Sequence, residues 1–220
     1  MKKNEHPGKF IVFEGLDGSG QSTQAELLRQ YAETLSFNVV LTKEPTPDSD
    51  AGRLAREILQ KKKDVSPQEL QKLFAEDREV HLREFIIPRL RDGWIVISDR
   101  YFLSSLAFGA ADGVNLDYLI ELNENKLNPE LVEPDLTIFL KVHPEIAMLR
   151  IKARGKETER FERLKKLRTV LSHYQELIAN RYEDIYIVDG EGGIKDISEK
   201  IRYTFETMIR AGWIRTLKQK

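Results

Sequence analysis

The residues from Phe13 to Gln24, FEGLDGSGQSTQ, have the spacing of a phosphate-binding loop. Gly15, Gly20 and Ser22 match the pattern G-x-x-x-x-G-K-[ST], in which glycines let backbone N–H groups surround an anion and the hydroxyl serves Mg²⁺ beside the phosphates. Position 21 departs from this pattern, because it holds Gln where the pattern has Lys. The stretch therefore predicts phosphate binding with one positive charge missing.

The sequence on either side of the loop fits the same chemistry. An apolar strand pattern at residues 10–13 precedes it and a helix pattern at residues 22–35 follows it, which is the order that anion binding at a helix N-terminus requires. The simpler alternative is a glycine-rich turn in which Ser22 only caps the helix. Loss of one transition-state donor typically lowers a rate by about 10²- to 10³-fold, so Gln21 should weaken turnover more than nucleotide binding.

Two other pairs of residues carry chemistry. Asp99 and Arg100 directly follow a predicted buried strand, where the Asp can hold a Mg²⁺-bound water and the Arg can clamp a substrate phosphate through its planar fork. Phe74 and Arg78 are four residues apart on a predicted helix and share one face, so a base could stack on the ring while the guanidinium donates to its carbonyl. The alternatives are a surface ion pair for the first pair, and a core Phe with a solvated Arg for the second.

The elements that must position these residues alternate along the chain. Short apolar runs predict strands at residues 10–13, 37–41, 94–97, 136–142 and 185–188. Helix-period stretches lie between and after them, at residues 22–35, 51–60, 67–91 with a possible break near Pro88, 104–110, 115–123, 144–154, 159–181 and 194–212. This alternation predicts an α/β fold with a five-stranded parallel sheet covered by helices on both faces, whose ligands bind at the carboxyl ends of the strands.

Composition limits the class of protein. The 220 residues carry a net charge of -1 and no cysteine, which argues against a nucleic-acid or membrane-surface partner and excludes disulfides and thiolate metal sites. We see neither a signal peptide nor an apolar span of membrane length, so we expect a cytoplasmic protein. No linker divides the chain, and we expect one domain over residues 1–220 with a mobile basic lid around residues 150–162.

Taken together, these motifs resemble the thymidylate kinase family. The resemblance runs from about Phe10 to Gly190 through FEGLDGSGQSTQ, TKEPT, LFAEDREVH, SDRYFLSSLAF, PDLTIFLKV, RIKARGKETERFE and VDG. It implies the P-loop NTPase fold of nucleoside-monophosphate kinases and transfer of the γ-phosphate of ATP to dTMP, with Mg²⁺, for dTTP biosynthesis. It also implies a homodimer.

The resemblance assigns roles residue by residue. It implies ATP-phosphate binding by Gly15, Leu16, Asp17, Gly18, Ser19, Gly20, Gln21, Ser22 and Thr23, and a metal held by Ser22 and, through water, by Asp99. It implies dTMP binding by Asp17 near the sugar 3′-hydroxyl, and by Lys43, Phe74, Arg78, Arg100, Tyr101, Ser104, Ser105 and Phe108. Lys43 departs from the family, which usually has Arg there on the acceptor phosphate, so we expect a weaker clamp. Asp17 could also be a turn residue, and the two serines could be helix caps.

The basic lid offers a way to offset Gln21. Thymidylate kinases place a catalytic Arg either inside the phosphate loop or in the lid, and Gly18 and Ser19 hold the loop positions here. The chain thus resembles the lid-arginine style, which implies catalytic roles for Arg154 and Arg160 beside Arg100 and Asp99. Such arginines are worth about 10³- to 10⁵-fold in related reactions. The alternative is a solvated charged loop.

Competing functions stay open at this stage. One is a catalytically weakened or silent nucleotide-binding homologue, whose mark would be Gln21. Another is a kinase for a different nucleoside or deoxynucleoside monophosphate, since few residues choose the base. A Gln introduced to trap a complex would give the same sequence. His81 shows no metal-ligand spacing with the other histidines, and we interpret it as structural.

Overall fold

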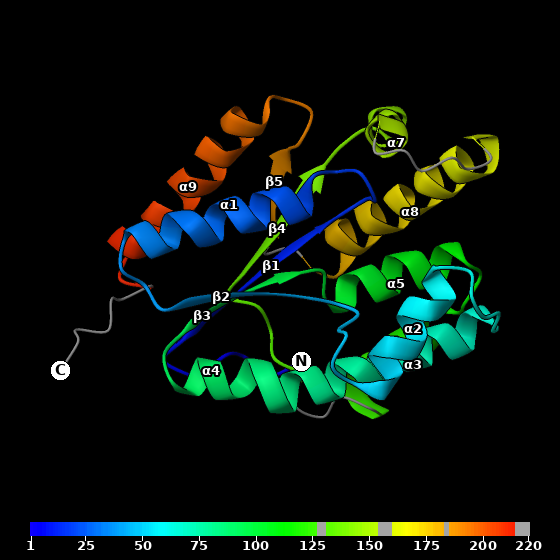
Figure 1. The fold of residues 1–220 in the computed structure, drawn as a ribbon, viewed down its shortest axis with the longest axis horizontal. Coiled ribbons are helices and arrows are strands. Elements are labelled where there is room, and N and C mark those ends of the chain that lie inside the picture. The colour runs from blue at the N-terminus through cyan, green and yellow to red at the C-terminus, as the bar shows by residue number, and fades with distance from the viewer. Residues whose placement is uncertain (127–130, 154–159, 183–184, 214–220) are drawn as a thin grey trace.

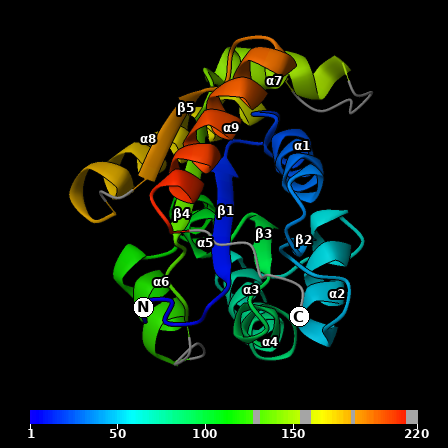
Figure 2. The same cartoon turned by 90° about the vertical axis from the view of Figure 1, so that its left-hand side faces the viewer.

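The computed structural model describes residues 1–126, 131–153, 160–182 and 185–213 of the chain. Within them, five strands form one sheet in the order β2-β3-β1-β4-β5, and every neighbouring pair is parallel. The strands are β1 (Lys9–Gly15), β2 (Val39–Lys43), β3 (Ile95–Asp99), β4 (Leu136–Lys141) and β5 (Ile185–Asp189). Figure 2 shows β1 at the middle, with β3 and β2 on one side and β4 and β5 on the other. The predicted five-stranded parallel sheet is confirmed.

Helices cover both faces of this sheet (Figure 1). They are α1 (Gln21–Thr34), α2 (Asp50–Leu59), α3 (Pro67–His81), α4 (Ile87–Arg91), α5 (Phe102–Ala111), α6 (Leu116–Glu121), α7 (Pro144–Ala153), α8 (Arg160–Asn180) and α9 (Ile194–Arg210), with π-helical turns η1 (Leu82–Ile86) and η2 (Leu122–Lys126). Among the described helices, none combines the length and the apolar character needed to cross a membrane.

The central strand β1 shows how one short apolar run can pack against the helices on both faces of the sheet. Successive side chains of a strand point to opposite faces, so Phe10 and Val12 enter one hydrophobic core while Ile11 and Phe13 enter the other. The first core includes residues of α5 and α8, and the second includes residues of α1 and α9. A buried strand of this kind reads as a continuous apolar run, which is the pattern FIVF shows.

The helical segment over residues 67–91 continues past the predicted break. The π-helical turn η1 joins α3 to α4, and Pro88 lies in the first turn of α4. Proline lacks an N–H and its ring conflicts with the carbonyl four residues earlier, so a wider turn just before it lets the helix continue. At its other end, Ser66 and Glu69 form a capping box that fixes where α3 begins.

The strand register brings three chain segments to one edge of the sheet. Asp99, the last residue of β3, pairs with Phe13 of β1 on one side and with Lys43 of β2 on the other. The carboxyl ends of these strands therefore meet where the chain turns from β1 into α1. This is the edge at which α/β sheets of this type bind ligands.

Candidate active site

The phosphate loop, residues 15–20, connects β1 to α1 through backbone angles that favour glycine. Gly18 and Gly20 have φ of 84° and 99°, and Gly20 is the N-cap of α1. Since glycine has no side chain to act as a cap, the first N–H groups of α1 can face an anion. A Cβ on Gly18 would lie 2.4 Å from the carbonyl oxygen of Ala147 in α7, so this position has no room for a side chain.

The expected phosphate-binding residues all fall on this loop and the first turn of α1. Leu16 is buried in the core and can offer only its backbone, while Asp17 projects outward, half exposed. The hydroxyl of Ser19 is buried without a hydrogen-bond partner among the described residues. Arg150 of α7 donates to the carbonyl of Ser19 at 3.1 Å, so an arginine of the expected lid lies against the loop. The loop therefore combines a backbone cradle with a cation on its outer side.

Gln21 brings no charge to this cradle. Its side chain is buried, and among the described residues its Oε1 has no hydrogen-bond partner. An unpaired amide oxygen in such a place disfavours a nearby phosphate oxygen and cannot neutralise it. The substitution thus removes the cation that the loop pattern expects, while the backbone remains suited to an anion.

Ser22 and Asp99 lie in contact at the start of α1. The Ser22 hydroxyl donates to Asp99 Oδ2, and the second oxygen, Oδ1, is buried without a partner among the described residues. A hydroxyl and an unpaired carboxylate oxygen are hard ligands that fit Mg²⁺, which takes most of its remaining ligands from water and phosphates. In the described ranges, no group of three or more acidic or histidine side chains could hold a metal ion, so the nucleotide would have to complete such a site.

Lys43 occupies a different position from the one the resemblance implies. Its Nζ lies 2.6 Å from Asp99 Oδ2 and 3.2 Å from the Ser22 hydroxyl. These two groups are the ones expected to hold the metal, whereas Lys43 is expected at the acceptor phosphate. The cross-strand register of Lys43 and Asp99 accounts for this contact.

Arg100 joins the loop to the opposite wall of the site. Its φ of 80° is left-handed, a conformation that costs a non-glycine residue energy and is concentrated at functional sites. Its guanidinium donates to Asp17 at 2.9 Å, to the Ser104 hydroxyl at 3.0 Å and to the carbonyl of Gly15 at 3.3 Å. The Phe108 ring lies 5.0 Å below it. The arginine therefore sits between the phosphate loop and the start of α5.

Glu14 is a buried acid that sequence reasoning missed. Its carboxylate accepts the backbone N–H groups of Tyr101 and Ser104, the Ser104 hydroxyl and the Tyr174 hydroxyl. Burial raises the pKa of the Glu14 carboxyl to about 7, against the lowering effect of these donors and of Arg100. A charged residue ending a fully apolar strand was the available signal, since buried carboxylates require partners.

This acid connects three parts of the site. Ser104, expected near the base and ribose, donates to Glu14 and accepts from Arg100, so it links the acid to the arginine. Tyr174 belongs to α8, and burial raises the pKa of its phenol well above 10, which keeps it a donor. Glu14 thus holds β1, the start of α5 and α8 together around Arg100.

Arg78 is fully buried on α3, so the alternative of a solvated helix charge is wrong. Its Nε donates to Glu44 at 2.7 Å, Nη2 to the Ser105 hydroxyl at 3.0 Å and also to Glu44, and Nη1 to Asn123. A guanidinium has five N–H groups, and these contacts leave one on Nη1 without an assigned partner among the described residues.

The other residues expected to bind dTMP differ in burial. Phe74 and Phe108 are partly exposed, so their rings remain accessible to a ligand. Tyr101 lies deeper than the resemblance implies: it is 1% exposed, and its hydroxyl donates to the carbonyl of Val132 at 3.1 Å. His81, for which the sequence identified no partner, lies 2.7 Å from the Thr42 hydroxyl and 3.1 Å from Glu44. It contributes to the structure around Arg78.

The lid falls partly outside the described residues. Arg154 lies outside the described residues, and so does the side chain of Arg160, the first residue of α8. Two described arginines contact the loop: Arg150, within the expected lid, donates to the Ser19 carbonyl, and Arg163, just after the expected lid, lies 3.9 Å from Asp17. Sequence reasoning missed Arg163, whose signal was its place one helical turn after Arg160.

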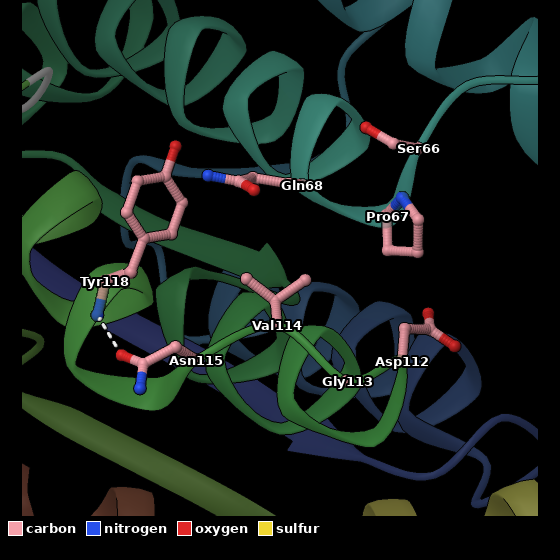
Figure 3. Close-up of a pocket in the computed structure, with 8 residues that line it drawn as sticks. All are labelled: Ser66, Pro67, Gln68, Asp112, Gly113, Val114, Asn115 and Tyr118. Atoms are coloured by element: carbon pink, nitrogen blue, oxygen red, sulfur yellow. Dashed lines mark hydrogen bonds between the residues drawn. The ribbon is translucent and has the colours of Figure 1, made fainter.

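The described residues also form a surface pocket away from this site. A surface pocket of about 430 Å³ is formed by the start of α3 and the turn between α5 and α6. Figure 3 shows Gln68 and Tyr118 facing one another across it, with Asp112 and Val114 on another wall. It shares no residue with the phosphate loop, the Ser22 and Asp99 pair or the surroundings of Arg100, so it is separate from the candidate active site.

Comparisons with known proteins point to one family. A family profile described as thymidylate kinase matches residues 13–201. The chain is 39% identical to the probable thymidylate kinase of Pyrococcus horikoshii over 88% of this chain and 94% of that protein. It is 35% identical to the thymidylate kinase of Caldicellulosiruptor saccharolyticus, over 92% of this chain and 98% of that protein. For the probable thymidylate kinase of Archaeoglobus fulgidus the identity is 36%, over 91% and 96%.

Proposed function

This chain belongs to the thymidylate kinase family, and we propose from that premise how its own residues perform the reaction. The protein is a phosphotransferase that moves the γ-phosphate of ATP to dTMP and yields ADP and dTDP for dTTP biosynthesis. The observation that carries the proposal is the contact of Arg100 with Asp17 and with the carbonyl of Gly15. It brings an acceptor-side cation next to the loop that holds the donor.

The donor side consists of the phosphate loop and its metal ligands. Backbone N–H groups of residues 15–23 surround the ATP phosphates, since this turn and the N-terminus of α1 form a cradle for an anion. Ser22 would hold Mg²⁺ directly and Asp99 through water, and their contact supports this pairing. When bound, the ion neutralises negative charge on the phosphates of ATP. Every other contribution comes from the backbone and side chains of the chain itself.

The acceptor side consists of the residues around Arg100. The guanidinium of Arg100 would leave Asp17 and bind the dTMP phosphate through its planar fork. Asp17 would then accept a hydrogen bond from the 3′-hydroxyl of the deoxyribose. Phe74 stacks on the base, and the N–H of Arg78 that has no assigned partner donates to a thymine carbonyl. With the other N–H groups of Arg78 fixed by buried partners, this donor is held in one direction.

Charge stabilisation of the transferring group falls to the lid. We assign it to Arg154 and Arg160, and the geometry of Gly18 supports this choice. A loop arginine at that position would meet both the left-handed backbone angle and the carbonyl of Ala147. A lid over ATP would also exclude water from the reacting phosphate. No covalent intermediate is needed, because alignment of donor and acceptor suffices.

Two further proposals come from the resemblance. The enzyme assembles as a homodimer, which light scattering can test. It acts in the cytoplasm, where ATP and dTMP are its partners, and it has neither a nucleic-acid nor a membrane partner.

A second function is favoured by one observation, the unpaired Oε1 of Gln21. If no other cation replaces the missing lysine, the chain binds nucleotide without turnover. Release of ADP from ATP, Mg²⁺ and a panel of monophosphates distinguishes the two functions, together with thermal shifts in the same mixtures. We expect dTMP to give the largest stabilisation and to stimulate ADP release. A larger shift with dGMP or dCMP would overturn the substrate assignment, and a shift with ATP without ADP release would indicate the silent binder.

A further inference from the structure

The phosphate loop lacks a charge that the neighbouring strand can provide. Gln21 is neutral and buried, and its amide oxygen has no partner among the described residues. Phosphoryl transfer builds negative charge on the donor oxygens, so a cation in this region would act directly on the reaction. One candidate is the lysine that ends β2, which contacts the residue after Gln21.

From the end of β2, the side chain of Lys43 reaches the hydroxyl of Ser22. Its Nζ lies 3.2 Å from the Ser22 hydroxyl and 2.6 Å from Asp99 Oδ2. Ser22 directly follows Gln21, and its hydroxyl is the group that the loop pattern assigns to the metal beside the β- and γ-phosphates. A cation bonded to this hydroxyl is therefore close to the donor phosphates as well.

The backbone beneath Lys43 is fixed, which makes this approach a property of the fold. Lys43 pairs in register with Asp99, and the next residue, Glu44, donates its N–H to the carbonyl of Asp99. The Glu44 carboxylate is held in turn by Arg78 and His81. The Lys43 side chain is 48% exposed, so its ammonium group can move while its backbone is held.

The charges at this point favour a shift of the ammonium when nucleotide arrives. Lys43 and Ser22 share one oxygen of Asp99, while the other oxygen has no partner among the described residues. Ser22 and Asp99 are also the residues that would hold the Mg²⁺ that accompanies ATP, so their oxygens would be less available to the ammonium once nucleotide is bound. The ATP phosphates then become the strongest anions within reach of Nζ.

We propose that Lys43 supplies the donor phosphates with the positive charge that position 21 lacks. The inference rests on the proposed function, in which ATP is the donor. It changes the role that the resemblance implies for this residue, since the acceptor phosphate is then held by Arg100 without Lys43. On this proposal, the lysine at the end of β2 has the role of the lysine that the loop pattern places at position 21.

Calorimetric titration of ATP with Mg²⁺ and of dTMP, each alone, tests this inference. Lys43→Gln should weaken ATP binding by about tenfold or more, as expected for loss of a charge-assisted hydrogen bond, and should leave dTMP affinity within about twofold. The decisive variant is Gln21→Lys combined with Lys43→Gln, which should recover ATP affinity to within about threefold of the parent. Lys200→Gln, the same change at an exposed site on α9, is the control and should alter neither affinity.

The opposite pattern would overturn the inference. If Lys43→Gln weakens dTMP binding and spares ATP, the lysine serves the acceptor, and if Gln21→Lys gives no recovery, the two positions do not share a role. Unfolding temperatures without ligand show whether each variant is folded, and Lys43→Arg, which keeps the charge, should retain most of the ATP affinity. Failure of the parent to phosphorylate dTMP would contradict the proposed function, whereas the ATP titrations would still decide the role of Lys43.

Discussion

Arg100 Nη2 lies 2.9 Å from Asp17 Oδ1, so an arginine at the end of β3 is tied to the middle of the phosphate loop. The same guanidinium reaches the carbonyl of Gly15 and the Ser104 hydroxyl. A planar fork is suited to such divided contacts and to bidentate binding of a phosphate. The residue can therefore exchange loop contacts for a substrate phosphate without a large movement.

Arg100→Lys should lower kcat/KM for dTMP by about 10²- to 10³-fold, because a lysine keeps the charge and loses the fork. KM for ATP should change little, since the backbone cradle is intact. Steady-state kinetics with each substrate varied in turn measures the difference. Arg210→Lys on α9, exposed and remote from the loop, is the matched control. Equal losses for both substrates would contradict the acceptor role.

Two glycines of the loop should respond differently to alanine. Both have left-handed φ angles, so each substitution carries a backbone cost of about 1 kcal/mol or more. A Cβ on Gly20 meets nothing within 4 Å, whereas on Gly18 it would lie 2.4 Å from the Ala147 carbonyl oxygen. Gly18→Ala should therefore lower the unfolding temperature more than Gly20→Ala. Equal effects would show that α7 moves away from the loop at no cost.

Arg78 should matter for stability as well as for the base. Arg78→Met leaves the buried Glu44 without its main partner, and removing one member of a buried ion pair typically costs about 3–5 kcal/mol. Chemical denaturation measures the loss, which Glu44→Gln in the same chain should partly reverse. Arg83→Met, at an exposed ion pair one turn later, should change the unfolding free energy by about 0.5 kcal/mol or less. Similar losses for the two arginine variants would refute the buried pair's role.

Glu14 should make the folded state more stable at lower pH. Burial raises the pKa of this carboxyl from an ordinary 4.5 to about 7, so the folded protein holds a proton that the unfolded chain releases. The contribution of this proton to stability is complete below about pH 4.5 and is lost as pH rises through about 7. The shift corresponds to a loss on the order of 3 kcal/mol across this window.

Glu14→Gln removes this titration, because the amide resembles the protonated acid. Its unfolding free energy relative to the parent should therefore rise between pH 5 and pH 8, on the order of the same 3 kcal/mol. Glu199→Gln, at an exposed site on α9, should show no comparable change. A constant difference between Glu14→Gln and the parent across this range would mean that Glu14 stays ionised throughout.

The sequence predicted the layers of the fold because they depend on local patterns. Apolar runs such as FIVF and the alternation of strands with helices leave few arrangements of a parallel sheet. The phosphate loop was predictable for the same reason, since its glycines and helix start are adjacent in the chain. The predicted break near Pro88 failed only because a π-helical turn accommodates the ring.

The contacts that organise the site were harder to predict, since they join residues far apart in the chain. Lys43 has a phosphate, Asp99 and water as plausible partners, and only the register of β2 with β3 selects Asp99. Glu14 finds Tyr174 on α8, 160 residues later. Residue types indicate that such side chains need partners, but only the packed structure shows which residues those partners are.

The most direct test of the account is the rate of dTDP formation from ATP, Mg²⁺ and dTMP, measured side by side for the protein as it stands and for Gln21→Lys. If cations outside the loop replace the missing lysine, both proteins form dTDP, and the kcat of the parent lies within about tenfold of the Lys variant. Formation of dTDP by the Lys variant alone, or by neither protein, would contradict the claim that cations outside the loop replace the missing lysine.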